Sequence, residues 1–132
     1  MQAIHAELTE RIIGAFFEVY NSLGRGFLER VYQKALELEF ANRGIRAVPQ
    51  APLKVTYKGI VVGEYFADFL VEDVILVEIK ACERLLDEHH AQVFNYLRAT
   101  SIELGLLLNF GPQPEVRRKI CQMERNKQVN LT

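Results

Sequence analysis

Apolar residues recur at helical spacing in the first third of the chain. From Leu8 to Leu23 they return every three or four positions, and a second series runs from Leu28 to Phe40. A period of 3.6 residues places such positions on one face of a helix, so we predict two amphipathic helices. Gly24 and Gly26 interrupt the pattern between them, and Gly44 stands where the second helix needs a C-terminal cap.

After Pro49 and Pro52 the pattern changes to the period of two that is typical of strands. Residues 53–57 alternate and lead into a Lys-Gly turn, and residues 60–71 and 74–81 are rich in β-branched and aromatic side chains. Only short turns separate these three segments, which favours an antiparallel meander.

The rest of the chain supplies a third helix and a further strand. Residues 87–100 repeat apolar positions at helical spacing, and residues 103–110 include a continuous apolar run that ends at Gly111-Pro112. The order helix, helix, three strands, helix, strand predicts an α/β fold with a central mixed sheet flanked by helices.

Composition and charge narrow the class of protein. The length of 132 residues suits one domain, expected to span residues 1–132 with a core over about 8–111 and a basic tail over 115–132. A net charge of −1 argues against a protein that coats nucleic acid through a broad positive field. The two cysteines lack zinc-site spacing and indicate a reducing compartment, and no apolar run is long enough for a membrane span. We therefore expect a cytoplasmic protein that does not bind membranes.

The second and third predicted strands carry charges inside an otherwise apolar sequence. Side chains two residues apart on a strand share a face, so Glu78 and Lys80 point the same way. A three-residue turn over 72–74 places Asp68 opposite Glu78, and two carboxylates and an ammonium then converge. The same register pairs Leu70 with Leu76 and Phe66 with Lys80.

Two interpretations of this cluster stay open on the pattern alone. In the first, Asp68 and Glu78 bind Mg²⁺ or Mn²⁺ with the backbone carbonyl of Ile79 as a further ligand, and Lys80 assists the attack of water on a phosphodiester. In the second, Lys80 only neutralises the two carboxylates in a surface charge ladder. The apolar surroundings favour the metal site.

Asp68 followed by Glu78-Ile79-Lys80 resembles the signature of the PD-(D/E)XK nuclease superfamily. Residues 26–32, GFLERVY, look like the G-x-x-E-x-x-Y motif that names one small bacterial family within it. Later blocks are similar too, at residues 63–81, 89–100 and 104–111. Over about residues 8–111 the resemblance implies a restriction-endonuclease-like fold with an αβββαβ core.

The resemblance also implies roles for four residues. Asp68 and Glu78 correspond to metal ligands, Lys80 to the catalytic lysine, and Glu29 to a helix-borne carboxylate that assists the metal site. A carboxylate in a first helical turn is also favoured by the helix dipole, so Glu29 has a purely structural alternative.

Gln92 and Tyr96, one helical turn apart, resemble the Q-x-x-x-Y feature of the exonuclease-like branch, which implies that they line the site and contact substrate. Tyr32 is a further candidate for lining the substrate site. Tyrosines at such positions also occur as packing residues with a satisfied hydroxyl, and that alternative stays open. His89 and His90 are adjacent, so they diverge on a helix and do not suit one metal ion; we expect His90 to be exposed.

The sequence thus predicts a magnesium-dependent nuclease that hydrolyses DNA or RNA. The alternative is a catalytically silent or partner-dependent module that binds nucleic acid or assists assembly and keeps the same fold; a homodimer suits either. Low basicity favours the module. The intact carboxylates and lysine favour the enzyme, because a binding module gains nothing from acidic groups where phosphate approaches.

Overall fold

Five strands form one mixed sheet with helices on both faces. The computed structural model describes residues 4–122. The helices are α1 (Ala6–Leu23), α2 (Glu29–Asn42) and α3 (Asp87–Arg98); the strands are β1 (Ala47–Tyr57), β2 (Ile60–Val71), β3 (Ile75–Lys80), β4 (Leu104–Phe110) and β5 (Pro114–Ile120). The predicted α/β class, with a mixed sheet flanked by helices, is confirmed.

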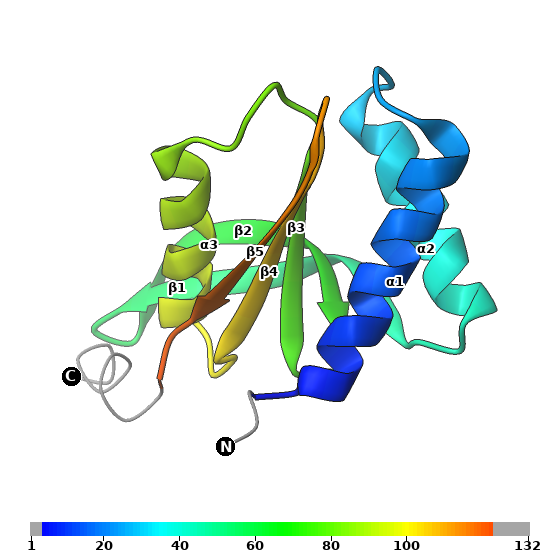
Figure 1. The fold of residues 1–132 in the computed structure, drawn as a ribbon. Coiled ribbons are helices and arrows are strands. Elements are labelled where there is room, and N and C mark those ends of the chain that lie inside the picture. Colours follow the sequence, from blue (N-terminus) through cyan, green and yellow to red (C-terminus); the bar gives the residue numbers. More distant parts are fainter. Residues whose placement is uncertain (1–3, 123–132) are drawn as a thin grey trace.

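The sheet follows the chain order β1-β2-β3-β4-β5, and only β3 and β4 pair in parallel. A parallel pair needs a long crossover, which α3 provides between the end of β3 and the start of β4. Helices α1 and α2 cover one face of the sheet and α3 covers the other (Figure 1).

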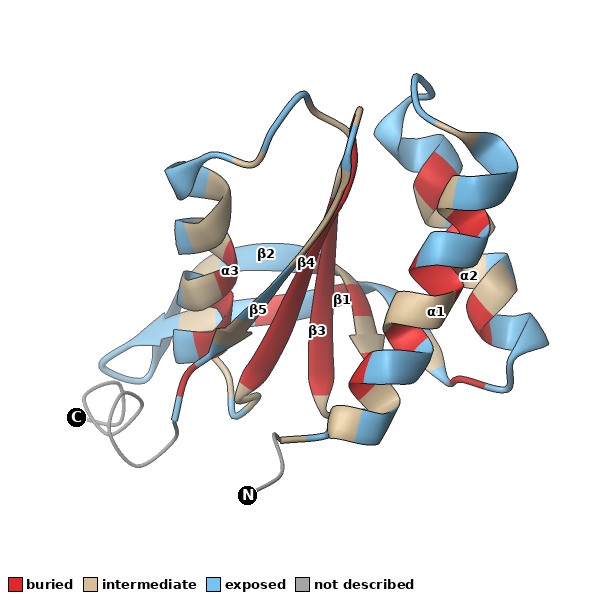
Figure 2. Cartoon of the chain, viewed as in Figure 1, coloured by how far each residue is buried: buried red, intermediate tan, exposed pale blue. Residues whose placement is uncertain are grey.

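The parallel pair is the most buried part of the sheet. Every residue of β4 is buried, and β3 is buried from Ile75 to Ile79 (Figure 2). Val77 and Ile79 pack in the cluster beneath α1 and α2, and Leu76 packs beneath α3. Both faces of β3 are therefore covered, as parallel strands require.

Two turns confirm the expected hairpins. Lys58 and Gly59 have φ angles of 51° and 80°, the left-handed pair that a two-residue hairpin turn needs. Residues 72–74 form the turn between β2 and β3, and Leu70 pairs with Leu76 as predicted. This register sets the side of the sheet on which the charged residues emerge.

Two strands differ from the sequence prediction. Strand β1 begins at Ala47 and contains Pro49 and Pro52, which is possible because an edge strand need not donate every backbone N–H. Strand β5 lies in the predicted basic tail and was not expected, since its charged sequence lacks an apolar pattern. Residues 123–132 of that tail lie outside the described residues. Between residues 4 and 122, no helix has the length and apolar character to cross a membrane.

Candidate active site

Strands β2 and β3 separate at Asp68 and Glu78, and the two carboxylates bridge the gap. The ladder between the strands ends at the Phe69–Val77 pair. Beyond it, the backbone N–H of Asp68 donates to Glu78 Oε1 at 2.8 Å, and the N–H of Ile79 donates to Asp68 Oδ2 at 2.8 Å. Asp68 and Glu78 therefore lie together as predicted.

The predicted pairing of Phe66 with Lys80 is wrong. The ladder between β2 and β3 has already ended at that point, and Phe66 is paired only on its other side, with Pro52 of β1. Strand β2 also twists at this point. Residues two apart on a regular strand share a face, yet Phe69 packs beneath α1 and α2 whereas Ala67 packs in the cluster beneath α3.

Burial of the two carboxylates makes their charged forms costly. Only 5% of Glu78 is exposed, and this burial, together with the charge of Asp68, raises the pKa of Glu78 to about 8. Burial also raises the pKa of Asp68, against the opposing effects of the Ile79 N–H and of Lys80. Two acids in this position are stabilised when positive charge lies between them.

Glu29 and Lys80 complete the cluster. Loss of surrounding water raises the pKa of Glu29, the charge of Lys80 lowers it, and the charge of Asp68 raises it again. Lys80 also lowers the pKa of both Asp68 and Glu78. The charges of the four predicted residues therefore act on one another, which places these residues in the same region of the fold.

Tyr32 holds the loop that positions Glu29. It is fully buried, its hydroxyl donates to the carbonyl of Gly24 at 2.6 Å, and it accepts from the N–H of Phe27 at 3.2 Å. Gly26, at φ 106°, adopts a conformation that favours glycine. The G-x-x-E-x-x-Y residues thus set where α2 begins. This burial leaves Tyr32 no surface to present to a substrate.

Gln92 and Tyr96 lie on α3 beside the carboxylates. The side-chain amide of Gln92 donates to the Tyr96 hydroxyl at 3.1 Å. Burial and then the charge of Glu78 raise the pKa of Tyr96, which places the phenol near the cluster.

The two histidines of α3 do not join the cluster. Nδ1 of His89 accepts the backbone N–H of Leu86 at 3.0 Å, which satisfies a free donor before the first turn of the helix. His90 is half-buried rather than exposed as expected, and the charges of Lys119 and Arg117 act on it from β5.

Gln50 is a contact of the cluster that the sequence did not reveal. Its side chain lies close enough to the Asp68 carboxylate to lower the pKa of that group, and its φ of 50° is rare for a residue with a side chain. A single glutamine in a strand carries no signal for such a role. A second amide, of Gln33 on α2, donates to the backbone carbonyl of Asp68 at 3.4 Å.

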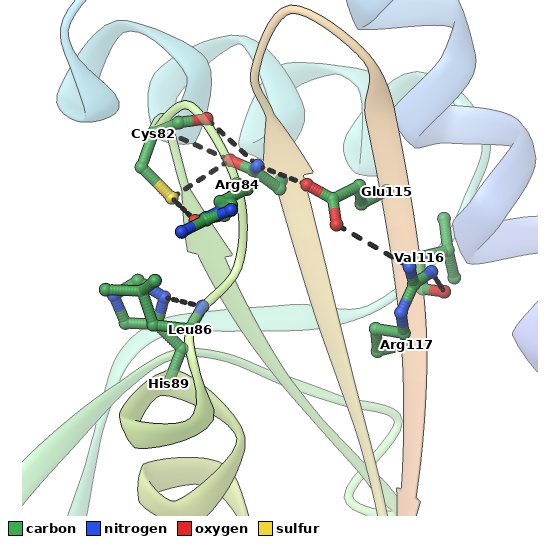
Figure 3. Close-up of polar contacts among 8 residues, drawn as sticks. Cys82, Arg84, Leu86, His89, Glu115, Val116 and Arg117 are labelled. Carbon is green, nitrogen blue, oxygen red and sulfur yellow. Dashed lines mark hydrogen bonds and ion pairs between the residues drawn. The ribbon is translucent and has the colours of Figure 1, made fainter.

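Asn109 holds the chain where β3 ends. It pairs with Lys80 in the parallel ladder, accepts the Cys82 N–H at 3.0 Å, and donates to the Cys82 carbonyl at 3.0 Å. Glu115 of β5 accepts from the same amide at 2.9 Å; Figure 3 shows Cys82 and Glu115 at the two ends of this network. A polar residue inside the apolar run of β4 was the signal that could have identified it.

A family model of the PD-(D/E)XK nuclease superfamily matches residues 6–120. The chain belongs to this superfamily. No curated protein sequence matches the chain significantly.

Two solved structures are similar to this superfamily member in fold. One is described as the crystal structure of SSO0001, with a TM-score of 0.52 and 18% identity over 77% of this chain. The chain spans only 55% of the length of SSO0001. The other is an alkaline exonuclease from Laribacter hongkongensis, LHK-Exo, with a TM-score of 0.52 and 12% identity over 98% of this chain and 80% of that one. At these identities the likeness concerns the fold alone.

The donor set of the cluster suits a hard cation such as Mg²⁺. Asp68 and Glu78 offer carboxylate oxygens, and mutual repulsion between them favours a bound positive charge. Among residues 4–122, no group of three or more His, Cys, Asp or Glu side chains is close enough to form a ready metal cage. Magnesium in proteins commonly keeps several waters and takes one or two carboxylates, so this superfamily member fits that ion better than zinc.

Proposed function

We propose that the chain is a divalent-metal-dependent nuclease that hydrolyses phosphodiester bonds in DNA or RNA. The observation that carries the proposal is the pair of carboxylates that bridges β2 and β3, with Glu78 buried, Asp68 half-buried, and the charges of Lys80 and Glu29 acting on them. Such a cluster raises the free energy of the folded protein, which indicates that it serves chemistry rather than stability.

The roles follow from the positions of the side chains. Asp68 and Glu78, with the backbone carbonyl of Ile79, would hold Mg²⁺ or Mn²⁺. When bound, the ion would polarise the phosphodiester and lower the pKa of a water. Lys80 orients that water or stabilises the charge that develops on the phosphate.

Glu29 and Gln92 support the site from two helices. Glu29 is the first residue of α2, whose start is set by the loop that Tyr32 fixes, and α2 covers the face of the sheet opposite α3 (Figure 1). From there its carboxylate would act on the cluster, in line with the mutual charge effects of Glu29, Asp68 and Lys80. Gln92 fixes the Tyr96 hydroxyl and contacts substrate. The intact Gly26, Glu29 and Tyr32 support membership of the G-x-x-E-x-x-Y family. The homodimer and the cytoplasmic location remain predictions.

Cleavage assays with matched variants test the proposal. Purified protein would be incubated with single-stranded and duplex DNA and RNA in Mg²⁺, in Mn²⁺ and in chelator. We expect cleavage only with metal, and a loss of at least about a thousandfold in Asp68→Ala and in Lys80→Ala, as for the removal of a major electrostatic group.

Two exposed residues serve as controls. Glu10→Ala, on α1, and Lys54→Ala, on β1, remove a negative and a positive charge away from the cluster and should keep full activity. Circular dichroism would establish that all four variants fold. Wild-type protein that cleaves no substrate with either metal, or an active Asp68→Ala, would refute the nuclease.

A further inference from the structure

A cavity of about 550 Å³ lies between α3 and the hairpin of β1 and β2. Its walls include Val55 of β1, Tyr65 of β2, and the α3 face that carries Ala91, Gln92 and Asn95. Ligand cavities in proteins commonly range from about 300 to 1,000 Å³, so the space accommodates a small planar group with its neighbours.

The lining combines aromatic surface with amide groups. The rings of Tyr65 and Tyr96 lie 5.6 Å apart at 43°, and 50% of Tyr65 is exposed, so one ring surface is open to a ligand. Gln92 and Asn95 place side-chain amides beside these rings, and the small side chain of Ala91 leaves space next to the helix. An aromatic face with amide donors and acceptors is the chemistry by which proteins bind unstacked nucleobases.

The cavity lies close to the carboxylate cluster. Tyr96 lines the cavity, and the charges of Glu78 and Asp68 act on its phenol. Tyr65 precedes Asp68 by three residues on β2, a distance of about 10 Å along a strand. A nucleotide next to the one held at the carboxylates therefore reaches the cavity.

We propose that this cavity binds an unstacked base of a single strand whose phosphodiester lies at Asp68, Glu78 and Lys80. The inference rests on the proposed nuclease function and names its substrate: single-stranded nucleic acid, or a strand end that has separated from its partner. A paired base has its edge and both faces covered, so a duplex enters only after unpairing.

Binding without cleavage isolates this claim. All proteins would carry Glu78→Gln and be kept in chelator, which removes one carboxylate charge and prevents catalysis. Fluorescence anisotropy would give affinities for a labelled 12-nucleotide single strand, as DNA and as RNA, and for a blunt duplex. We expect the single strand to bind at least tenfold more tightly than the duplex. Comparison of the affinities for the DNA and the RNA strand would show whether the cavity prefers deoxyribose or ribose.

Two cavity variants and two controls locate the binding site. Tyr65→Ala removes the open ring and Ala91→Leu fills the cavity, and each should weaken single-strand binding by about tenfold. Phe17→Ala, on α1, and Ala41→Leu, on α2, remove a ring and lengthen a side chain at exposed positions on the other face of the sheet and should leave affinity unchanged.

The outcomes separate this claim from the proposed function. Equal affinity for single strand and duplex, or full affinity in both cavity variants, overturns the base-binding cavity even if the wild-type enzyme cleaves DNA. Conversely, single-strand binding that depends on Tyr65 and Ala91 supports the base-binding cavity, whatever the cleavage assay shows. If the wild-type protein then cleaves nothing with metal, only the proposed nuclease function is refuted.

Discussion

The two faces of the sheet are packed differently. Beneath α1 and α2 the space is filled by aromatic side chains, with the Phe110 ring 4.7 Å from that of Phe16 and 4.3 Å from that of Tyr32. Beneath α3 the buried cluster is smaller, and a cavity of about 550 Å³ lies beside the carboxylates. Two helices close one face and a single helix leaves the other partly open. We infer that the first face supplies most of the stability and the second supplies the functional surface.

The largest effect should come from removing an aromatic ring on the closed face. Phe16→Ala should lower the free energy of unfolding by about 3–5 kcal/mol, because a fully buried ring leaves a cavity that its neighbours cannot fill. Tyr65→Ala on the open face should cost less than about 1 kcal/mol, since half of its surface is already exposed. Urea denaturation of both variants measures the contrast. Equal losses would show that the faces do not differ in stability.

The buried carboxylate of Glu78 should make the metal-free protein less stable as pH rises. Its pKa is raised from 4.5 in the unfolded chain to about 8 in the fold. Below pH 4.5 both states bind the proton and the group has no effect on stability. Between pH 4.5 and 8 the folded state alone retains the proton, so stability falls as pH increases and levels off above pH 8. At about 1.4 kcal/mol per pKa unit, the full loss is on the order of 4–5 kcal/mol.

Glu78→Gln tests this dependence directly. The variant cannot ionise, so in chelator its unfolding free energy should exceed that of the wild type at pH 8 and match it at pH 4.5. Glu64→Gln, at an exposed position of β2, is the matched control and should leave the pH profile unchanged. A Glu78→Gln protein that shows the wild-type decline with pH would mean that another group causes it.

The sequence alone identified the cluster because two local rules determine it. A three-residue turn sets the β2–β3 register, and the period of two then puts Glu78 and Lys80 on the side toward which Asp68 points. The separation of the strands beyond Phe69, by contrast, depends on how β2 turns toward α3. That is a tertiary property, which is why the Gln50 contact and the cavity were not predicted.

The errors have equally physical causes. Tyr32 was a candidate for lining the substrate site, with a packing role as the open alternative, because it lies one helical turn after Glu29 in the same motif. The path of the Gly24–Phe27 loop, which the pattern does not predict, turns its hydroxyl inward and favours the packing role. Strand β5 carries Arg117 and Arg118 at an exposed edge, where charges discourage pairing with another chain, so its sequence resembles a solvated tail.

A smaller difference in unfolding free energy is expected between two Ala→Leu variants, one on each face of the sheet. Ala15 is a fully buried residue of α1 in the core cluster, so Ala15→Leu should overpack the core and lower the unfolding free energy by about 1–3 kcal/mol. Ala91→Leu adds the same atoms at the open face and should change it by no more than about 0.5 kcal/mol. Thermal unfolding followed by circular dichroism compares them. A destabilised Ala91→Leu would mean that the cavity is closed in solution.

The smallest effect on stability, and the most informative about the open face, should come from Gln50. The left-handed backbone of Gln50 costs free energy that glycine avoids, so Gln50→Gly relieves strain while it removes the amide that favours the charged form of Asp68. We expect the unfolding free energy to change by less than about 1 kcal/mol, since the two effects oppose each other.

Function should respond to Gln50→Gly more strongly than stability does. Without the amide, the Asp68 carboxylate is less well oriented, so kcat should fall by about tenfold with little change in KM, together with a weaker Mg²⁺ affinity measured by calorimetry. Lys58→Gly, which also replaces a left-handed residue but lies at the hairpin tip, should relieve strain without this loss. If both variants keep full kcat and metal affinity, the strained conformation of Gln50 serves the bend of the strand rather than the carboxylate cluster.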